Sequence, residues 1–268
     1  MSTAASSIET VTITVGSGDQ ARQIATQSRR SKTEASGPAL MWLGGYRSDM
    51  AGTKAIEMDR LADTHGLAAI RFDYSGHGQS GGDFKDGTIS RWTEEALSVL
   101  DHEAPESVIL IGSSMGGWIA LRLIEEIRRR GNGPEIEGLV LIAPAPDFTI
   151  ELIEPQLTDT ERHDLAEKGY FEEISEYSPD PNIFTRKLFE DGEKNRVLKG
   201  IVETGCPVHI LQGMNDPDVP YTHALKLLEH LPSDDVVLTL IRDGDHRLSR
   251  PQDLERMTAA IEEIVQHC

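Results

Sequence analysis

The chain has 268 residues and carries 26 Lys and Arg against 45 Asp and Glu, which gives a formal net charge of -19 at pH 7. A charge of this sign opposes binding to phosphate backbones and to anionic lipid surfaces, so nucleic acid is not an expected partner. No apolar run approaches the roughly 18 residues that cross a bilayer. The length predicts a single α/β domain over residues 1–268.

The cysteines and the first residues bear on the compartment. Cys206 and Cys268 are the only cysteines, which gives neither a disulfide framework nor the spacing of metal ligands. Residues 1–10 lack the basic start and the long apolar segment of a secretory signal. We therefore expect a cytoplasmic protein, and we expect neither a metal nor an organic cofactor.

Apolar runs alternate with amphipathic helical stretches along most of the chain. An exposed strand over 8–15 and an edge strand over 22–27 are expected to form a hairpin, and residues 31–38 a loop. Buried strands are predicted at 39–43, 67–72, 107–111, 138–143, 207–211 and 236–241, and helices at 54–65, 89–104, 118–130 and 254–265. This alternation predicts an α/β fold with a mostly parallel central sheet and helices on both faces.

Residues 148–200 interrupt this alternation. The segment is acidic, Pro-broken and rich in apolar and aromatic residues, namely Ile153, Leu157, Tyr170, Phe171, Ile174, Tyr177, Phe184, Leu188 and Phe189. We interpret it as a small helical lid over the carboxyl edge of the sheet, with an apolar pocket for an acyl group. The alternative is a subdomain that packs only for stability.

The sequence Gly112-Ser113-Ser114-Met115-Gly116 lies between a buried strand and a helix. This is the pattern of a nucleophile elbow, in which a sharp turn exposes one hydroxyl and glycines leave space on either side. The hydroxyl is that of Ser114. The alternative is a glycine-rich connection without chemistry.

Paired glycines, Gly44 and Gly45, follow the strand at 39–43. A tight turn alone would explain them. In nucleophile-elbow enzymes, however, a loop at this position supplies one backbone N–H to the oxyanion, and the residue after the nucleophile supplies the other. We expect the amides of Tyr46 and Met115 to be these donors.

A nucleophilic serine needs a base and an orienting acid. His246 follows the last strand, and Asp216 follows the strand before it, so the chain order is Ser, Asp, His. Asp218 competes with Asp216 for the role of the acid. Other candidates have structural interpretations: Asp243 and Asp245 as turn residues that bond nearby backbone, and His77 as a loop-packing residue.

Two of these motifs resemble the α/β-hydrolase superfamily, Gly213-x-x-Asp216-x-x-Val219-Pro220 and Gly244-x-His246, and the resemblance extends over roughly residues 8–267. It implies that Asp216 is the acid of the triad. Residues 45–55, 70–76 and 112–118 resemble, more narrowly, the family of mitochondrial palmitoyl-protein thioesterases that also hydrolyse acyl glucuronides. That resemblance implies a small serine esterase or thioesterase acting on a small-molecule or acylated substrate.

Fold and triad do not fix the acyl donor, so a peptidase or a lactonase with the same triad remains an alternative. A hydrolase fold used only for binding is another.

Overall fold

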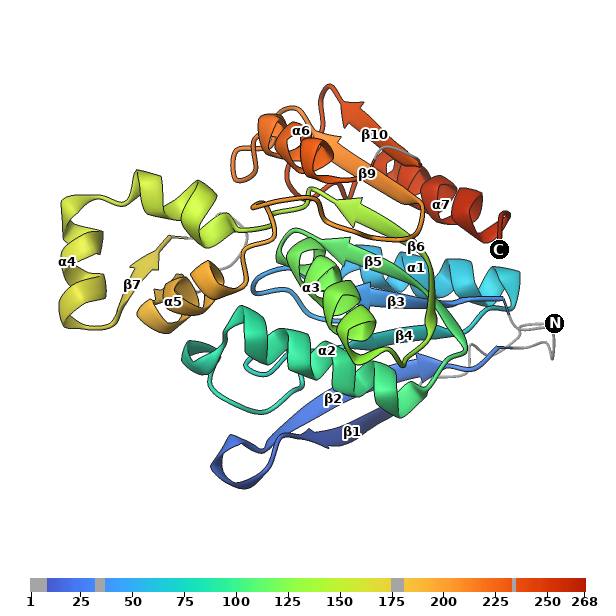
Figure 1. The fold of residues 1–268 in the computed structure, drawn as a ribbon, viewed down its shortest axis with the longest axis horizontal. Coiled ribbons are helices and arrows are strands. Elements are labelled where there is room, and N and C mark those ends of the chain that lie inside the picture. The colour runs from blue at the N-terminus through green and yellow to red at the C-terminus, as the bar shows by residue number, and fades with distance from the viewer. Residues whose placement is uncertain (1–8, 32–36, 175–180, 233–234) are drawn as a thin grey trace.

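An eight-stranded sheet forms the centre of this computed structural model, which describes residues 9–31, 37–174, 181–232 and 235–268. The strand order is β1-β2-β4-β3-β5-β6-β9-β10 (Figure 1). From β4 to β10 all neighbouring strands are parallel, whereas β2 is antiparallel to both β1 and β4. The strands are β1 Thr10–Val15, β2 Arg22–Arg29, β3 Ala39–Leu43, β4 Ala69–Phe72, β5 Ser107–Ser113, β6 Glu135–Ile142, β9 Val208–Gly213 and β10 Val236–Ile241.

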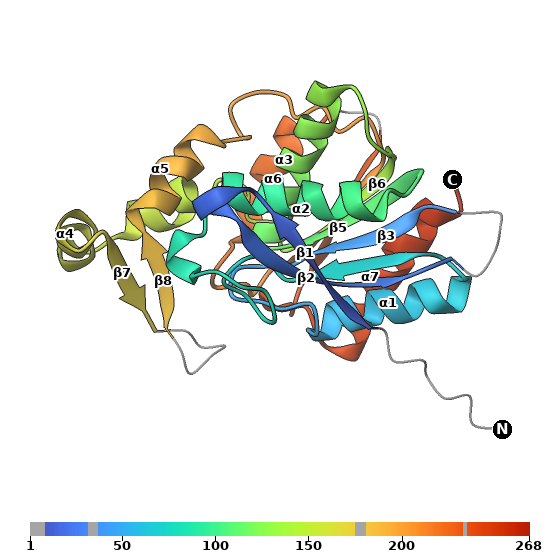
Figure 2. The same cartoon turned by 90° about the horizontal axis from the view of Figure 1, so that it is seen from below.

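Helices cover both faces of the sheet because successive strand residues point to opposite sides. On one face Leu40 and Trp42 of β3 pack with α1 (Thr53–His65) and α7 (Pro251–Val265). On the other, Met41 and Leu43 pack with α2 (Ile89–Glu103), α3 (Met115–Arg130) and α6 (Tyr221–His230). Figure 2 shows the two helical layers above and below the strands. The predicted fold class is confirmed.

One strand and one helix differ from expectation. The strand predicted as an edge at 22–27 lies inside the sheet, since β2 pairs with β1 on one side and with β4 on the other. Helix α6 was not predicted, although its buried residues Ala224 and Leu227 have helical spacing. Residue 8 of the first predicted strand and residues 32–36 of the predicted loop lie outside the described residues.

The 148–200 segment connects β6 to β9 and projects beyond the sheet on the left of Figure 1. It contains a π-helical turn at Thr149–Ile153, α4 (Asp159–Glu167) and α5 (Arg186–Lys194). We expected a small helical lid here. The structure adds to its helices an antiparallel pair of strands, β7 (Tyr170–Glu173) and β8 (Asn182–Thr185), which was not predicted. This pairing joins strands separated by the eight residues 174–181, which is longer than the two-residue turns that mark a hairpin in the sequence, so local patterns did not reveal it.

The start of α3 lies directly against the end of β3. A Cβ atom at Gly116 would lie 2.0 Å from the carbonyl oxygen of Leu43. Backbone atoms cannot yield to such a contact, so we expect Gly116→Ala to lower the free energy of unfolding by more than about 2 kcal/mol. Gly200→Ala is the matched control, because its Cβ would meet no atom within 4 Å. Urea unfolding measures both variants, and equal midpoints would contradict this account of the packing.

Candidate active site

Ser114 lies at the turn between β5 and α3, with φ 54° and ψ -118°. A non-glycine residue in this region carries backbone strain that the surrounding structure must sustain. The strand-turn-helix context predicted for the elbow is present. Gly112 also fits its predicted role, since a Cβ there would lie 2.5 Å from the carbonyl oxygen of Gly116.

The structure brings together the three side chains expected to form a triad. Nε2 of His246 lies 3.2 Å from Oγ of Ser114, and Nδ1 of His246 lies 2.8 Å from Oδ2 of Asp216. The Asp216 carboxylate is fully buried, whereas the His246 side chain keeps 16% exposure. The residues come from the carboxyl ends of β5, β9 and β10, the edge at which open α/β sheets form their sites.

Several hydrogen bonds hold the Asp216 carboxylate in place. Its Oδ1 accepts from the backbone amides of Asp218 and Val219, at 2.9 and 2.8 Å. Its Oδ2 accepts from Nε2 of Gln212 at 3.2 Å, and Gln212 also donates to the carbonyl of Val219. Sequence reasoning missed Gln212. The only signal was an amide residue directly after an apolar strand.

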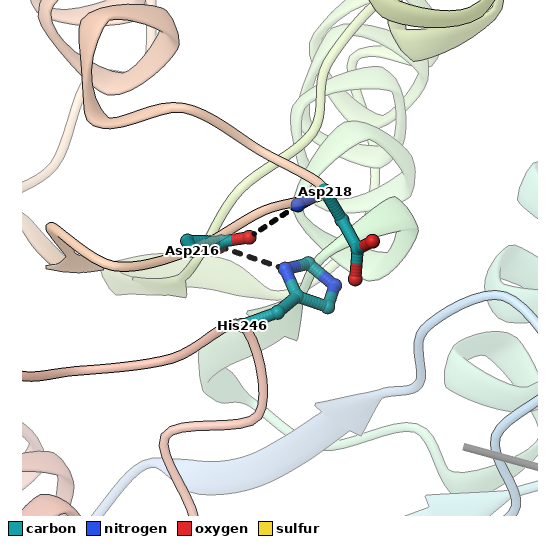
Figure 3. Close-up of side chains that lie close together, drawn as sticks. All are labelled: Asp216, Asp218 and His246. Atoms are coloured by element: carbon teal, nitrogen blue, oxygen red, sulfur yellow. Dashed lines mark hydrogen bonds and ion pairs between the residues drawn. The ribbon is translucent and has the colours of Figure 1, made fainter. Parts of the chain in front are cut away.

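Asp218, the competing acid, lies beside the imidazole of His246 (Figure 3). Asp216, Asp218 and His246 each place a potential ligand atom within 4.8 Å of the others, and they are the one such group found in the described parts of the chain. Exposed acidic groups commonly cluster without a metal, and Nδ1 of His246 already bonds Asp216. We assign no metal here.

Side-chain contacts fix the loop that carries His246. Asp245 behaves as the predicted turn residue, since its Oδ1 accepts the amide of Leu248 at 2.9 Å. Asp243 likewise bonds backbone, its own amide, and its carboxylate also binds the guanidinium of Arg250 at 2.8 Å. The ammonium of Lys54 in α1 donates to the carbonyl of Arg247.

The loop after β3 packs against the elbow. A Cβ at Gly45 would lie 3.2 Å from the carbonyl oxygen of Ser113, which shows how closely the two backbones approach. The turn and cap hydrogen bonds of the described residues use neither the amide of Tyr46 nor that of Met115. In the described part of the chain, both amides thus lack a backbone acceptor in a turn, loop or cap.

The Tyr46 side chain connects this loop to the 148–200 segment. Its hydroxyl donates to the carbonyl of Ile183 in β8, and its ring stacks on Phe184 with centroids 5.3 Å apart. Burial raises the pKa of the Tyr46 hydroxyl well above its ordinary value, so the hydroxyl stays protonated and acts as a donor.

A cavity of about 570 Å³ opens onto Ser114 and His246. Apolar side chains of the 148–200 segment form much of its wall: Phe148, Leu152, Ile153, Leu157, Phe171, Ile174 and Phe184. Other residues expected in an apolar pocket lie elsewhere. Leu188 and Phe189 are buried in the core, the ring of Tyr170 lies 3.6 Å from the Lys85 ammonium, and Tyr177 is outside the described residues.

His77 is a buried loop residue rather than a second base. Its Nδ1 donates to the carbonyl of Ser75 at 3.1 Å, and its Nε2 accepts the amide of Arg47 at 3.2 Å. Burial lowers the pKa of the imidazole from 6.5 to about 4. The ring is therefore neutral near pH 7 and holds the loop that follows Tyr46.

This burial has a consequence for acid stability. Between pH 6.5 and 4 the unfolded chain protonates His77 while the folded chain does not, so stability falls as the pH falls through that range. The total loss from this residue is about 3 kcal/mol. Urea unfolding at about pH 7 and about pH 4.5 should show a smaller acid loss for His77→Gln than for the wild type. Parallel losses would contradict the assignment.

The fold and the site geometry together are those of a hydrolase, and comparison with known proteins agrees. The profile of the alpha/beta hydrolase family matches residues 35–260. The mouse mitochondrial palmitoyl-protein thioesterase is 31% identical over 230 residues, which are 85% of this chain and 75% of that protein. The human protein of the same name is 30% identical over 236 residues, which cover 87% and 75% of the two chains.

Solved structures give the same result. A protein from Agrobacterium vitis described as a candidate hydrolase has 68% identity and a TM-score of 0.94, with 96% of this chain and 99% of that chain covered. The mouse alpha/beta hydrolase domain-containing protein 10 has 27% identity and a TM-score of 0.81, with 96% and 99% covered. The chain belongs to the alpha/beta hydrolase family, and the prediction of an enzyme of the ester or thioester hydrolase class is confirmed at that level.

Proposed function

We propose that the chain is a serine hydrolase that cleaves carboxylic esters or thioesters through an acyl-enzyme on Ser114. One observation carries the proposal: a continuous set of contacts runs from Oγ of Ser114 through both ring nitrogens of His246 to the buried carboxylate of Asp216, at 3.2 and 2.8 Å. A hydroxyl becomes a nucleophile when a neutral imidazole can take its proton and a carboxylate stabilises the resulting imidazolium.

In this mechanism Oγ of Ser114 attacks the carbonyl carbon as Nε2 of His246 takes the hydroxyl proton. The carbonyl oxygen becomes an oxyanion that accepts hydrogen bonds from the amides of Tyr46 and Met115. When it collapses, the bond to the leaving group breaks and His246 gives that group the proton. Water then attacks the acyl-enzyme with the same proton exchanges, releases the carboxylic acid and restores Ser114.

The cavity supports an acyl substrate. Its wall of apolar and aromatic side chains from the 148–200 segment lies next to Ser114, which suits the carbon chain of an acyl group. The mouse and human relatives are named palmitoyl-protein thioesterases, which makes a thioester a leading candidate. We propose that the 148–200 segment is the lid of a single domain spanning residues 1–268.

The location of the protein stays a prediction. No helix among the described residues is both long and apolar enough to cross a membrane. The cytoplasmic location expected from the sequence differs from that of the curated relatives, which are named as mitochondrial proteins.

A fluorophosphonate probe tests the nucleophile. The probe should label the wild-type protein and should fail to label Ser114→Ala, because only an activated serine is phosphonylated. Ser113→Ala is the matched control, since it removes the neighbouring hydroxyl, and it should keep the label. A wild-type protein that does not react would favour a hydrolase fold used only for binding.

A panel of p-nitrophenyl esters, acyl thioesters, acyl glucuronides, lactones and aminoacyl amides identifies the reaction. Turnover of the first three classes is expected. Turnover confined to lactones or amides would assign the same triad to a lactonase or a peptidase instead.

The acid can be tested separately. Asp216→Asn should lower kcat by roughly a thousandfold or more, because an amide cannot stabilise the imidazolium and can hold the wrong tautomer. Asp218→Asn should lower kcat by less than about tenfold, since the amide that supports Asp216 belongs to the backbone. Steady-state kinetics of both variants decide, and the reverse order would move the acid to Asp218.

A further inference from the structure

Arg47 is the only Lys or Arg among the described residues that line the cavity around Ser114. The other charged side chains in that wall are the carboxylates of Glu161, Glu173 and Asp218 and the imidazole of His246. A single guanidinium in a largely apolar and acidic wall marks one point at which the cavity attracts an anion.

Arg47 is held in a costly conformation. Its φ is 56°, a left-handed value that disfavours residues other than glycine, and its amide is fixed by Nε2 of His77 at 3.2 Å. Its guanidinium carbon lies 4.5 Å from the centre of the Phe84 ring, a cation–π contact that restricts where the group can go. Local strain of this kind accumulates at sites that bind ligands.

The guanidinium also lacks a full set of partners. Nε of Arg47 is buried, and no group in the described part of the chain accepts its hydrogen bond. A buried donor without an acceptor costs free energy, and more so when it is charged. A bound anion next to the guanidinium would offset this cost by neutralising the charge.

We propose that Arg47 binds a carboxylate carried by the acyl part of the substrate, so that the enzyme prefers esters or thioesters of dicarboxylic acids. This inference rests on the proposed function and extends it to the substrate class. Arg47 directly follows Tyr46, the residue whose amide is the proposed oxyanion donor. Arg47 and Ser114 line the same cavity, so a carboxylate at the end of the acyl chain can reach the guanidinium, whose planar donor geometry it matches.

The charge of Asp218 assigns the carboxylate to the acyl part rather than to the leaving group. Its carboxylate lies within 4.8 Å of a ring nitrogen of His246, and Figure 3 shows the two side chains next to each other. His246 protonates the leaving group, so that group departs close to Asp218. A negative charge on it would be repelled there, whereas an uncharged alcohol or thiol would not.

Two substrates that differ only in charge test the proposal. The first is p-nitrophenyl hydrogen adipate, whose acyl chain ends in a carboxylate. The second is its methyl-ketone analogue, in which an acetyl group of nearly the same shape replaces the carboxylate. The wild type should show a higher kcat/KM for the adipate ester. A nitrophenyl hexanoate with a carboxylate on the phenol should be a poorer substrate than plain p-nitrophenyl hexanoate.

Arg47→Met removes the charge and keeps much of the length. It should reduce the adipate-to-ketone ratio of kcat/KM about ten- to hundredfold, the range expected when a charge-assisted hydrogen bond is lost. Arg47→Lys should keep part of the preference. Lys85→Met is the matched control, because that ammonium lies 3.6 Å from the centre of the Tyr170 ring and does not line the cavity. Its ratio should equal that of the wild type.

An unchanged ratio in Arg47→Met, or a wild-type preference for the ketone, would overturn the proposal. Calorimetric binding of free adipate and of the corresponding keto acid provides a readout that needs no turnover. Wild type should bind adipate more tightly, and Arg47→Met should lose that difference. If no ester is hydrolysed but this binding difference holds, the proposed function fails while the anion subsite stands. Equal binding of the two acids to the wild type would remove the subsite.

Discussion

The parallel register of the central strands is the constraint on which the site depends. Ser113 of β5 pairs with Ile142 of β6, which pairs with Leu211 of β9, while Gly213 pairs with Ile241 of β10. Strands aligned in this way end side by side, so the residues that follow them meet at one edge. A shift of register in β9 or β10 would separate Asp216 and His246 from Ser114 even if each loop kept its own conformation.

The charges at this edge are unevenly distributed. Asp216 is buried and its carboxylate accepts four hydrogen bonds, one of them from Nδ1 of His246, so its charge acts on that imidazole. Asp218 is exposed and lies beside the imidazole of His246. Arg47, on the loop that follows β3, places its guanidinium over the ring of Phe84. On our proposal, these charges distinguish the two halves of a substrate. Arg47 favours a carboxylate on the acyl group, and Asp218 favours a neutral leaving group.

Much of the sheet and of the candidate triad could be predicted because the signals are local. The elbow needs only a strand, a helix and glycines within a few residues of Ser114, and the order of Asp216 and His246 follows from which strands they end. The β7–β8 pair, Gln212 and the Arg47 guanidinium depend on contacts between distant parts of the chain. Patterns within a short window do not encode such contacts. The predicted roles of Ser114, Asp216, His246, Tyr46 and Met115 stay predictions until the variants are measured.

Tyr46 contributes both to the loop after β3 and to the wall of the cavity, because its hydroxyl bonds Ile183 and its ring stacks on Phe184. If its amide receives the oxyanion, any outward movement of β8 that admits a bulky acyl group also releases the residue that must face the reacting carbonyl. The protein could then either admit the acyl group, with β8 displaced, or hydrolyse it, with Tyr46 in place, but not both at once. While β8 is displaced, the site would lack one of its two proposed oxyanion donors, so water that reaches Ser114 would find it less reactive.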